Sequence, residues 1–210
     1  MSDADAALRE PWTDLDRQRT GVTVGVWLFI VSEVLFFGAL FLGYAVYRAL
    51  YPEAFRIAGA HTEVFYGGLN LLLLLTSSAA MTIAVDASRL QMRPVTLVCL
   101  ALTMLLGLGF LLCKGLEYRD DIAKGLLPGA HFPLQPPQTQ LFWAFYWVMT
   151  SVHAIHLATG LVIVGVLASL LWRRTLPIQT PAIQGVATYW HFVDTVWIIL
   201  FPLLYLIGRS

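Results

Sequence analysis

Five long apolar runs, separated by short polar segments, dominate the hydrophobic pattern of this 210-residue chain. A helix needs about 20 mostly apolar residues to cross the hydrocarbon core of a bilayer, and each run is long enough. The runs do not alternate between apolar and polar residues, as membrane strands do. The pattern therefore predicts an all-α integral membrane bundle of five transmembrane helices. The predicted spans cover about residues 21–48, 64–85, 95–116, 141–172 and 187–207.

The composition supports a protein that faces lipid over most of its surface. Hydrophobic residues make up 58% of the chain and charged residues only 12%, with a mean hydropathy of +0.72. Soluble domains average about 25% charged residues. Residues 1–20 are polar and lack the apolar core of a signal peptide, so we expect residues 21–210 to form a single membrane domain. The net charge of zero indicates no nucleic-acid partner.

The connections predict one ordered loop and an orientation. Prolines recur in segment 117–140, where they favour an extended path and a fixed surface loop. Lysine and arginine are divided almost evenly between the two sides, but closely spaced arginines flank span ends on only one of them. These are Arg17 and Arg19, Arg89 and Arg93, and Arg173 and Arg174. The positive-inside rule then predicts a multi-pass protein of the cytoplasmic (inner) membrane, with a cytoplasmic N-terminus and a C-terminus on the outer, periplasmic side.

Ionisable residues inside spans are costly unless they are paired, so they are the main candidates for function. Glu33 lies near the middle of the first span, while His153 and His156 project from one face of the fourth. We expect Glu33 to form a hydrogen bond with one of the two imidazoles across the first and fourth helices. The carboxyl group either joins two helices or takes part in a proton relay, and the residues alone leave both readings open.

Four other polar residues near or inside the spans have less defined roles. Glu117 and Tyr118 follow the third predicted span, where we expect exposed side chains that cap the helix or reach toward the interface. His191 and Asp194 are spaced i, i+3 in the fifth span. Together with His153 and His156 they make a metal-dependent membrane enzyme conceivable, but no second carboxylate-rich helix completes such a site. We therefore predict interhelical hydrogen bonds, no metal and no catalytic residue. The role of Asn70 in the second span is left open.

Several motifs in register resemble subunit III of the haem–copper respiratory oxidases. The longest is the string Tyr189-Trp190-His191-Phe192-Val193-Asp194, which resembles the last helix of that family. Three further stretches match in the family's order, namely Trp27-Leu28-Phe29 with Ser32-Glu33, Lys114-Gly115-Leu116-Glu117-Tyr118, and His153-Ala154-Ile155-His156. The resemblance extends from about residue 21 to the end of the chain, and because the chain starts at the carboxylate-bearing helix it resembles the bacterial five-helix type.

The resemblance implies a non-catalytic core subunit of a proton-pumping terminal oxidase, of the cytochrome c oxidase type, which reduces O2 to water in aerobic electron transport. It implies subunits I and II as partners, with subunit I the main contact. Haem and copper then belong to the partner subunits, and this chain binds no redox centre but associates with phospholipid. The implied role is to support the stability of the complex and sustained proton uptake. Glu33 becomes the family's buried carboxylate, and Glu117, Tyr118, His191 and Asp194 become structural polar contacts.

Two alternatives remain at this point. Quinol oxidases and nitric-oxide reductases have related small subunits, and the electron donor binds elsewhere in those complexes. An independent proton-coupled transporter would use Glu33 and the histidines as a proton path. The absence of inverted repeats and of interrupted helices in two corresponding halves argues against the transporter.

Overall fold

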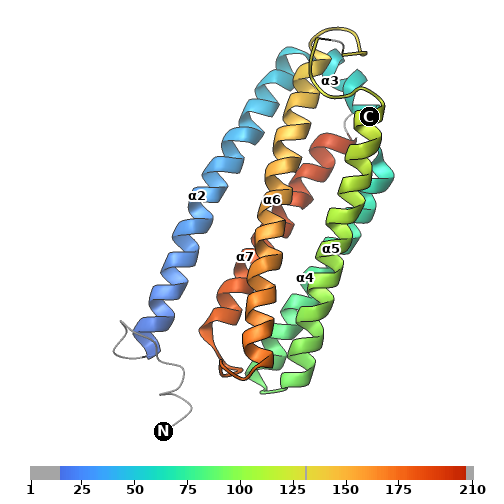
Figure 1. Cartoon of the computed structure of the whole chain (residues 1–210). Helices are drawn as coiled ribbons and strands as arrows, with labels where there is room; N and C mark the ends of the chain where they lie inside the picture. Colours follow the sequence, from blue (N-terminus) through green and yellow to red (C-terminus); the bar gives the residue numbers. More distant parts are fainter. Residues whose placement is uncertain (1–14, 131, 207–210) are drawn as a thin grey trace.

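The computed structural model describes residues 15–130 and 132–206, and over these residues the chain is a bundle of long helices (Figure 1). Five of them are long and apolar enough to cross a membrane, which confirms the predicted fold class for the described part of the chain. The helices are α2 (Leu15–Leu50), α3 (Pro52–Gly59), α4 (Val64–Arg89), α5 (Arg93–Ala123), α6 (Thr139–Trp172) and α7 (Pro181–Phe201), and α7 continues into a π-helical turn, η1 (Pro202–Leu206). The predicted polar segment at residues 1–20 lies largely outside the described residues.

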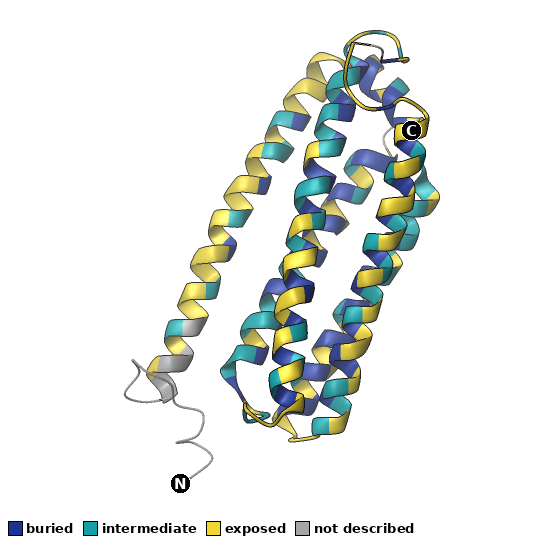
Figure 2. Ribbon diagram, in the orientation of Figure 1, coloured by how far each residue is buried: buried dark blue, intermediate teal, exposed yellow. Residues whose placement is uncertain are grey.

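Helices α4 to α7 form a four-helix bundle, and α2 lies along one side of it (Figure 1). Only 11% of the apolar stretch of α2 is buried, against 33–50% in the other four spans. Figure 2 shows this difference as a nearly continuous exposed surface along α2. Helix α2 contacts α6 and α7 along one edge, so few of its own side chains contribute to its attachment.

Two predicted span ends differ from the structure for a physical reason. Helix α5 continues to Ala123 instead of ending at Leu116, because the charged residues that follow Leu116 lower the hydropathy but still favour a helix. Helix α7 begins at Pro181 rather than near residue 187, with the Thr180 side chain accepting the Ala182 N–H at its N-terminus. The predicted loop therefore shrinks to the segment between α5 and α6, and Glu117 lies within a helix.

Glycines allow the bundle helices to approach aromatic side chains closely. A Cβ atom built on Gly107 of α5 would lie 3.0 Å from Trp190 of α7 and 3.0 Å from Leu161 of α6. A Cβ atom built on Gly67 of α4 would lie 2.8 Å from the Tyr205 side chain. Small residues at such contacts let helices pack closely in a membrane, where the hydrophobic effect does not drive them together.

Replacing Gly107 by alanine tests this packing. We expect G107A to lower the stability of the protein by roughly 1–2 kcal/mol, because overpacking costs about 1–3 kcal/mol and the gain in helix propensity offsets at most about 1. Gly115 in the same helix has no atom within 4 Å of a built Cβ, so G115A is the matched control and should be neutral or stabilising. Thermal denaturation in detergent measures both, and equal stability of the two variants would contradict the argument.

Candidate functional site

Glu33 of α2 and His156 of α6 form a hydrogen-bonded pair between the two helices. The Nε2 atom of His156 lies 2.9 Å from Oε2 of Glu33, which is the bond that the sequence predicts for one of the two histidines. The Nδ1 atom of His156 lies 2.8 Å from the carbonyl oxygen of Val152, which only accepts, so Nδ1 carries a hydrogen. A second hydrogen then bridges Nε2 and Oε2, and either the imidazole or the carboxyl group carries it.

The pair lies at an edge of the bundle and is only partly covered. The side chains of His156 and Glu33 are 19% and 17% exposed, respectively. Phe37 of α2 packs edge-on against the His156 ring at 5.3 Å, and the Tyr189 hydroxyl donates to the His156 carbonyl oxygen at 2.9 Å. These contacts hold the pair at the junction of α2, α6 and α7, where both side chains stay partly exposed.

His153 occupies a different environment from His156. Three residues of helix rotate the side-chain direction by 300°, so the two imidazoles diverge by about 60°. His153 is 0% exposed and packs between the rings of Phe110 and Trp197, at 5.4 and 5.1 Å. Neither of its ring nitrogens has a hydrogen-bond partner among the described residues. His153 therefore packs in the bundle core and does not contact Glu33.

Lys114 and Glu117 form a fully buried ion pair near the C-terminal end of α5. Their side chains are 2% and 1% exposed, and Nζ lies 3.0 Å from Oε2 of Glu117. Nζ also lies 3.0 Å from the Tyr146 hydroxyl of α6 and 2.7 Å from the Tyr205 hydroxyl of η1. The prediction that Glu117 is an exposed capping residue is therefore wrong, because α6 and η1 cover this end of α5. Sequence reading missed both tyrosines.

Aromatic rings complete the surroundings of the ammonium group. Nζ of Lys114 lies 4.5 Å from the centre of the Tyr146 ring and 4.8 Å from that of Tyr118, within the range of cation–π attraction. The Tyr118 hydroxyl lies 2.8 Å from that of Thr150 in α6, so this residue makes the interhelical contact that the resemblance implies. Asp121, which the sequence analysis did not single out, is 1% exposed, and its Oδ2 atom lies 2.8 Å from the Tyr146 hydroxyl.

The remaining polar candidates lie between α4 and α7. Nδ1 of His191 is 2.7 Å from the Ser78 hydroxyl, Asp194 is buried one turn further along α7, and Asn70 is buried in α4. In the part of the chain that the structure describes, no three His, Cys, Asp or Glu side chains form a group that could bind a metal ion. The four-residue cluster that a metal-dependent enzyme would need is not formed.

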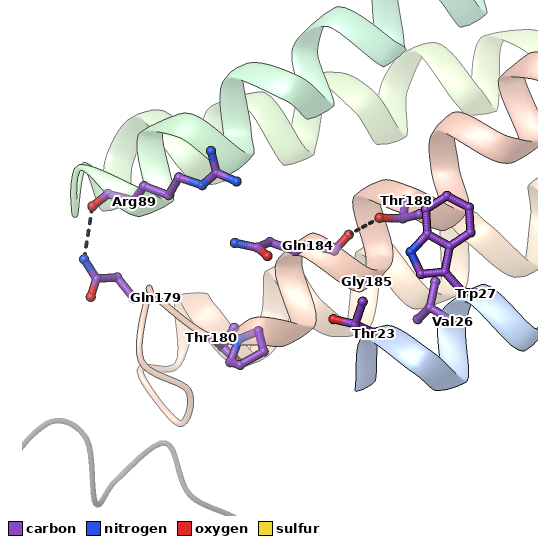
Figure 3. Close-up of a pocket in the computed structure, with 10 residues that line it drawn as sticks. Thr23, Val26, Trp27, Arg89, Gln179, Thr180, Gln184, Gly185 and Thr188 are labelled. Atoms are coloured by element: carbon purple, nitrogen blue, oxygen red, sulfur yellow. Dashed lines mark hydrogen bonds between the residues drawn. The ribbon is translucent and has the colours of Figure 1, made fainter. Parts of the chain in front are cut away.

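A pocket of about 470 Å³ lies between the N-terminal half of α2 and the start of α7 (Figure 3). Arg89, at the end of α4, reaches its edge, and the Gln179 amide donates to the Arg89 carbonyl oxygen at 3.0 Å. The lining is mainly polar, with one large aromatic residue, and consists of Thr23, Val26, Trp27, Arg89, Gln179, Thr180, Pro181, Gln184, Gly185 and Thr188. A second pocket of about 310 Å³ shares three of these residues and includes His191. Sequence reading did not find either pocket.

Comparisons with known proteins match almost the whole chain to one family. The family model for cytochrome c oxidase subunit III matches residues 13–209. The chain is 31% identical over 188 residues to cytochrome c oxidase subunit 3 of Synechocystis sp., covering 87% of this chain and 74% of that protein. It is 30% identical over 191 residues to quinol oxidase subunit 3 of Bacillus subtilis, covering 88% of this chain and 86% of that protein.

Removing the buried ammonium tests the importance of the Lys114 cluster. We expect K114M to destabilise the protein by about 3–5 kcal/mol, because Glu117 would remain buried without its counter-charge. K124M is the matched control, since Lys124 forms a half-exposed pair with Glu63 at 2.7 Å, and such pairs contribute about 0–1 kcal/mol. Thermal denaturation in detergent compares the two, and a similar loss in both variants would show that burial does not matter here.

Proposed function

The chain belongs to the cytochrome c oxidase subunit III family, and from this membership we propose that it supports oxidase assembly and sustained proton uptake through the Glu33–His156 pair. It is a multi-pass membrane protein and a non-catalytic subunit of a haem–copper terminal oxidase. In our proposal, haem and copper are held by the partner subunits. The reduction of O2 then takes place outside this chain.

The Glu33–His156 pair is the observation that carries the proposed role. It joins α2 to α6, and α2 has few other buried residues to attach it to the bundle. The pair also holds one proton between two ionisable groups, at a place that is only partly covered. A hydrogen bond of this kind at the edge of the bundle suits a subunit that stabilises the oxidase complex during proton uptake.

We further propose that subunit I is the main partner and that subunit II also contacts the chain. The support is the apolar outer surface, which includes much of α2 and suits both lipid and other membrane helices. We place the N-terminus on the cytoplasmic side of the inner membrane and the C-terminus on the outer side, because arginines lie close to the span ends on one side. Arg89 and Arg173 mark that side.

Phospholipid is the proposed ligand of the pocket beside α2. Arg89 offers a cationic group at its edge, and the Gln184 side chain offers an amide N–H donor. Trp27, which is 57% exposed, suits the level of the lipid headgroups. These groups fit a phosphate headgroup whose acyl chains lie along the exposed face of α2.

A quinol oxidase is the second candidate, because relatives from both oxidase classes match at nearly equal identity. Purification of the native complex distinguishes the two. A subunit II whose spectrum shows a copper centre would indicate cytochrome c as the electron donor. A subunit II without copper would indicate quinol.

Replacing Glu33 by glutamine tests the proposed support role. E33Q changes a charge-assisted or proton-sharing bond into an ordinary one and should weaken α2 attachment by about 1–2 kcal/mol. We expect a nearly normal initial rate of O2 reduction but earlier inactivation and more loss of this subunit during purification. E53Q is the control, since Glu53 pairs with Arg56 on the exposed face of α3. An immediate and complete loss of O2 reduction in E33Q would refute a supporting role.

Replacing Arg89 by glutamine tests the lipid pocket. R89Q removes the cationic group, so we expect less phospholipid to copurify with the complex, as measured by native mass spectrometry. Arg173 is exposed at the end of α6 and does not line the pocket, so R173Q is the control on the same side. Equal lipid content in the two variants would count against Arg89 as a headgroup ligand.

A further inference from the structure

The buried cluster around Lys114 contains more oxygen–oxygen contacts than its tyrosines can bridge. Oη of Tyr146 lies 2.7 Å from Oε1 of Glu117 and 2.8 Å from Oδ2 of Asp121. Oη of Tyr205 lies 2.8 Å from the same Oε1 of Glu117. Two oxygen atoms at such distances have a hydrogen between them. The three contacts therefore require three hydrogens.

The cluster's own donors supply only two of them. Each tyrosine hydroxyl carries one hydrogen. The Lys114 ammonium has three N–H groups, and these point to Glu117 Oε2, Tyr146 Oη and Tyr205 Oη, so it has none left. The third hydrogen must lie on a carboxyl group. We propose that the cluster is a proton-binding site in which Asp121 is a carboxylic acid that donates to the Tyr146 hydroxyl.

Position decides which carboxyl group carries the proton. Glu117 lies beside the Lys114 ammonium, which favours its ionised form. Lys114 attracts Asp121 as well, but its ion pair is with Glu117, and the Asp121 carboxyl contacts the neutral Tyr146 hydroxyl. With the proton on Asp121, that hydroxyl accepts from Asp121 and Lys114 and donates to Glu117. Each hydrogen then lies between one donor and one acceptor, and Oε1 of Glu117 accepts from both tyrosines.

The charges give the same answer independently. One ammonium and one carboxylate make the buried cluster neutral, whereas an ionised Asp121 would leave a net negative charge where the side chains are 1–2% exposed. Lys124 attracts an ionised Asp121, but burial outweighs this attraction, and the two neighbouring cations are paired elsewhere, Lys124 with Glu63 at 2.7 Å and Arg119 with Asp120 at 3.2 Å. The titratable and charged groups around Asp121 are Lys114, Glu117, Tyr118, Arg119, Asp120 and Lys124 from α5 and its end, Tyr146 from α6, Tyr205 from η1, and Glu63 and Tyr66 at the start of α4.

A bound proton at this place makes the end of the bundle sensitive to pH. The folded cluster binds a proton that an exposed aspartate in the unfolded chain releases well below neutral pH. Stability therefore decreases as the pH rises and the proton leaves. Without it, the Tyr146 hydrogen can bridge only one of its two carboxylate contacts, and the other becomes repulsive. The junction of α5 with α6 then loosens.

Infrared spectroscopy of the purified oxidase complex tests the proposal. We expect a carbonyl band of a protonated carboxylic acid at mildly acidic pH that is lost in D121N and retained in D120N, the exposed neighbour. Asparagine donates an N–H to Tyr146 and cannot ionise, so D121N should also lose the fall in melting temperature that wild type and D120N show as the pH rises above the acidic range. A wild-type spectrum without a band that D121N removes, or an equal fall in melting temperature in D121N, would overturn the proposal.

A second pair of variants keeps the test decisive if D121N does not assemble. Y146F removes the acceptor of the Asp121 O–H, so the carbonyl band should shift to higher frequency, as expected for a carboxylic acid that no longer donates. Y118F removes a hydroxyl that bonds to Thr150 and should leave the band unchanged. A band that Y146F does not shift would refute the assignment.

Discussion

A polar group inside a bilayer has no water to bond with, so a partner within the protein stabilises it strongly. In this chain such partners join α2 to α6, α5 to α6 and η1, and α4 to α7. Glu33 needs the imidazole of α6, and Lys114 needs Glu117 together with hydroxyl groups from α6 and η1. His191 of α7 has Ser78 of α4. These bonds specify which helices meet, while apolar packing alone would allow several arrangements.

Packing divides the molecule into a tight bundle and a loosely attached helix. Within the bundle, Gly107 lets Trp190 pack against α5, and Gly67 does the same for Tyr205. Helix α2 has no comparable set of buried side chains, since only 11% of its apolar stretch is buried. Its position therefore depends on a few contacts, among them the Glu33–His156 pair and the buried Tyr44, whose hydroxyl donates to the Leu203 carbonyl oxygen at 2.6 Å.

The sequence predicted what depends on hydropathy and on the cost of burial. The five spans follow from apolar runs, and the bond of Glu33 to an imidazole follows from its depth. The sequence could not predict that Glu33 bonds to His156 and not to His153, because their spacing places both on one face of the helix. Burial of Glu117 was also missed. The charged residues after Leu116 resemble an exit from the membrane, and the tyrosines that cover Glu117 come from 29 and 88 residues further along the chain.

The two buried clusters use the same electrostatic solution in different surroundings. Each combines a basic group, a carboxyl group and a shared proton into a neutral unit, as burial requires. The Glu33–His156 pair is 17–19% exposed at the edge of the bundle, where lipid or a partner subunit can cover it. The Lys114 cluster is enclosed by α5, α6 and η1, and Asp121 lies next to the loop after α5, where its carbonyl oxygen accepts the Leu126 N–H at 3.0 Å. In the proposed orientation, assembly with partner subunits would change the surroundings of the Glu33–His156 pair. The pH on the outer side of the membrane would change the protonation of the Lys114 cluster.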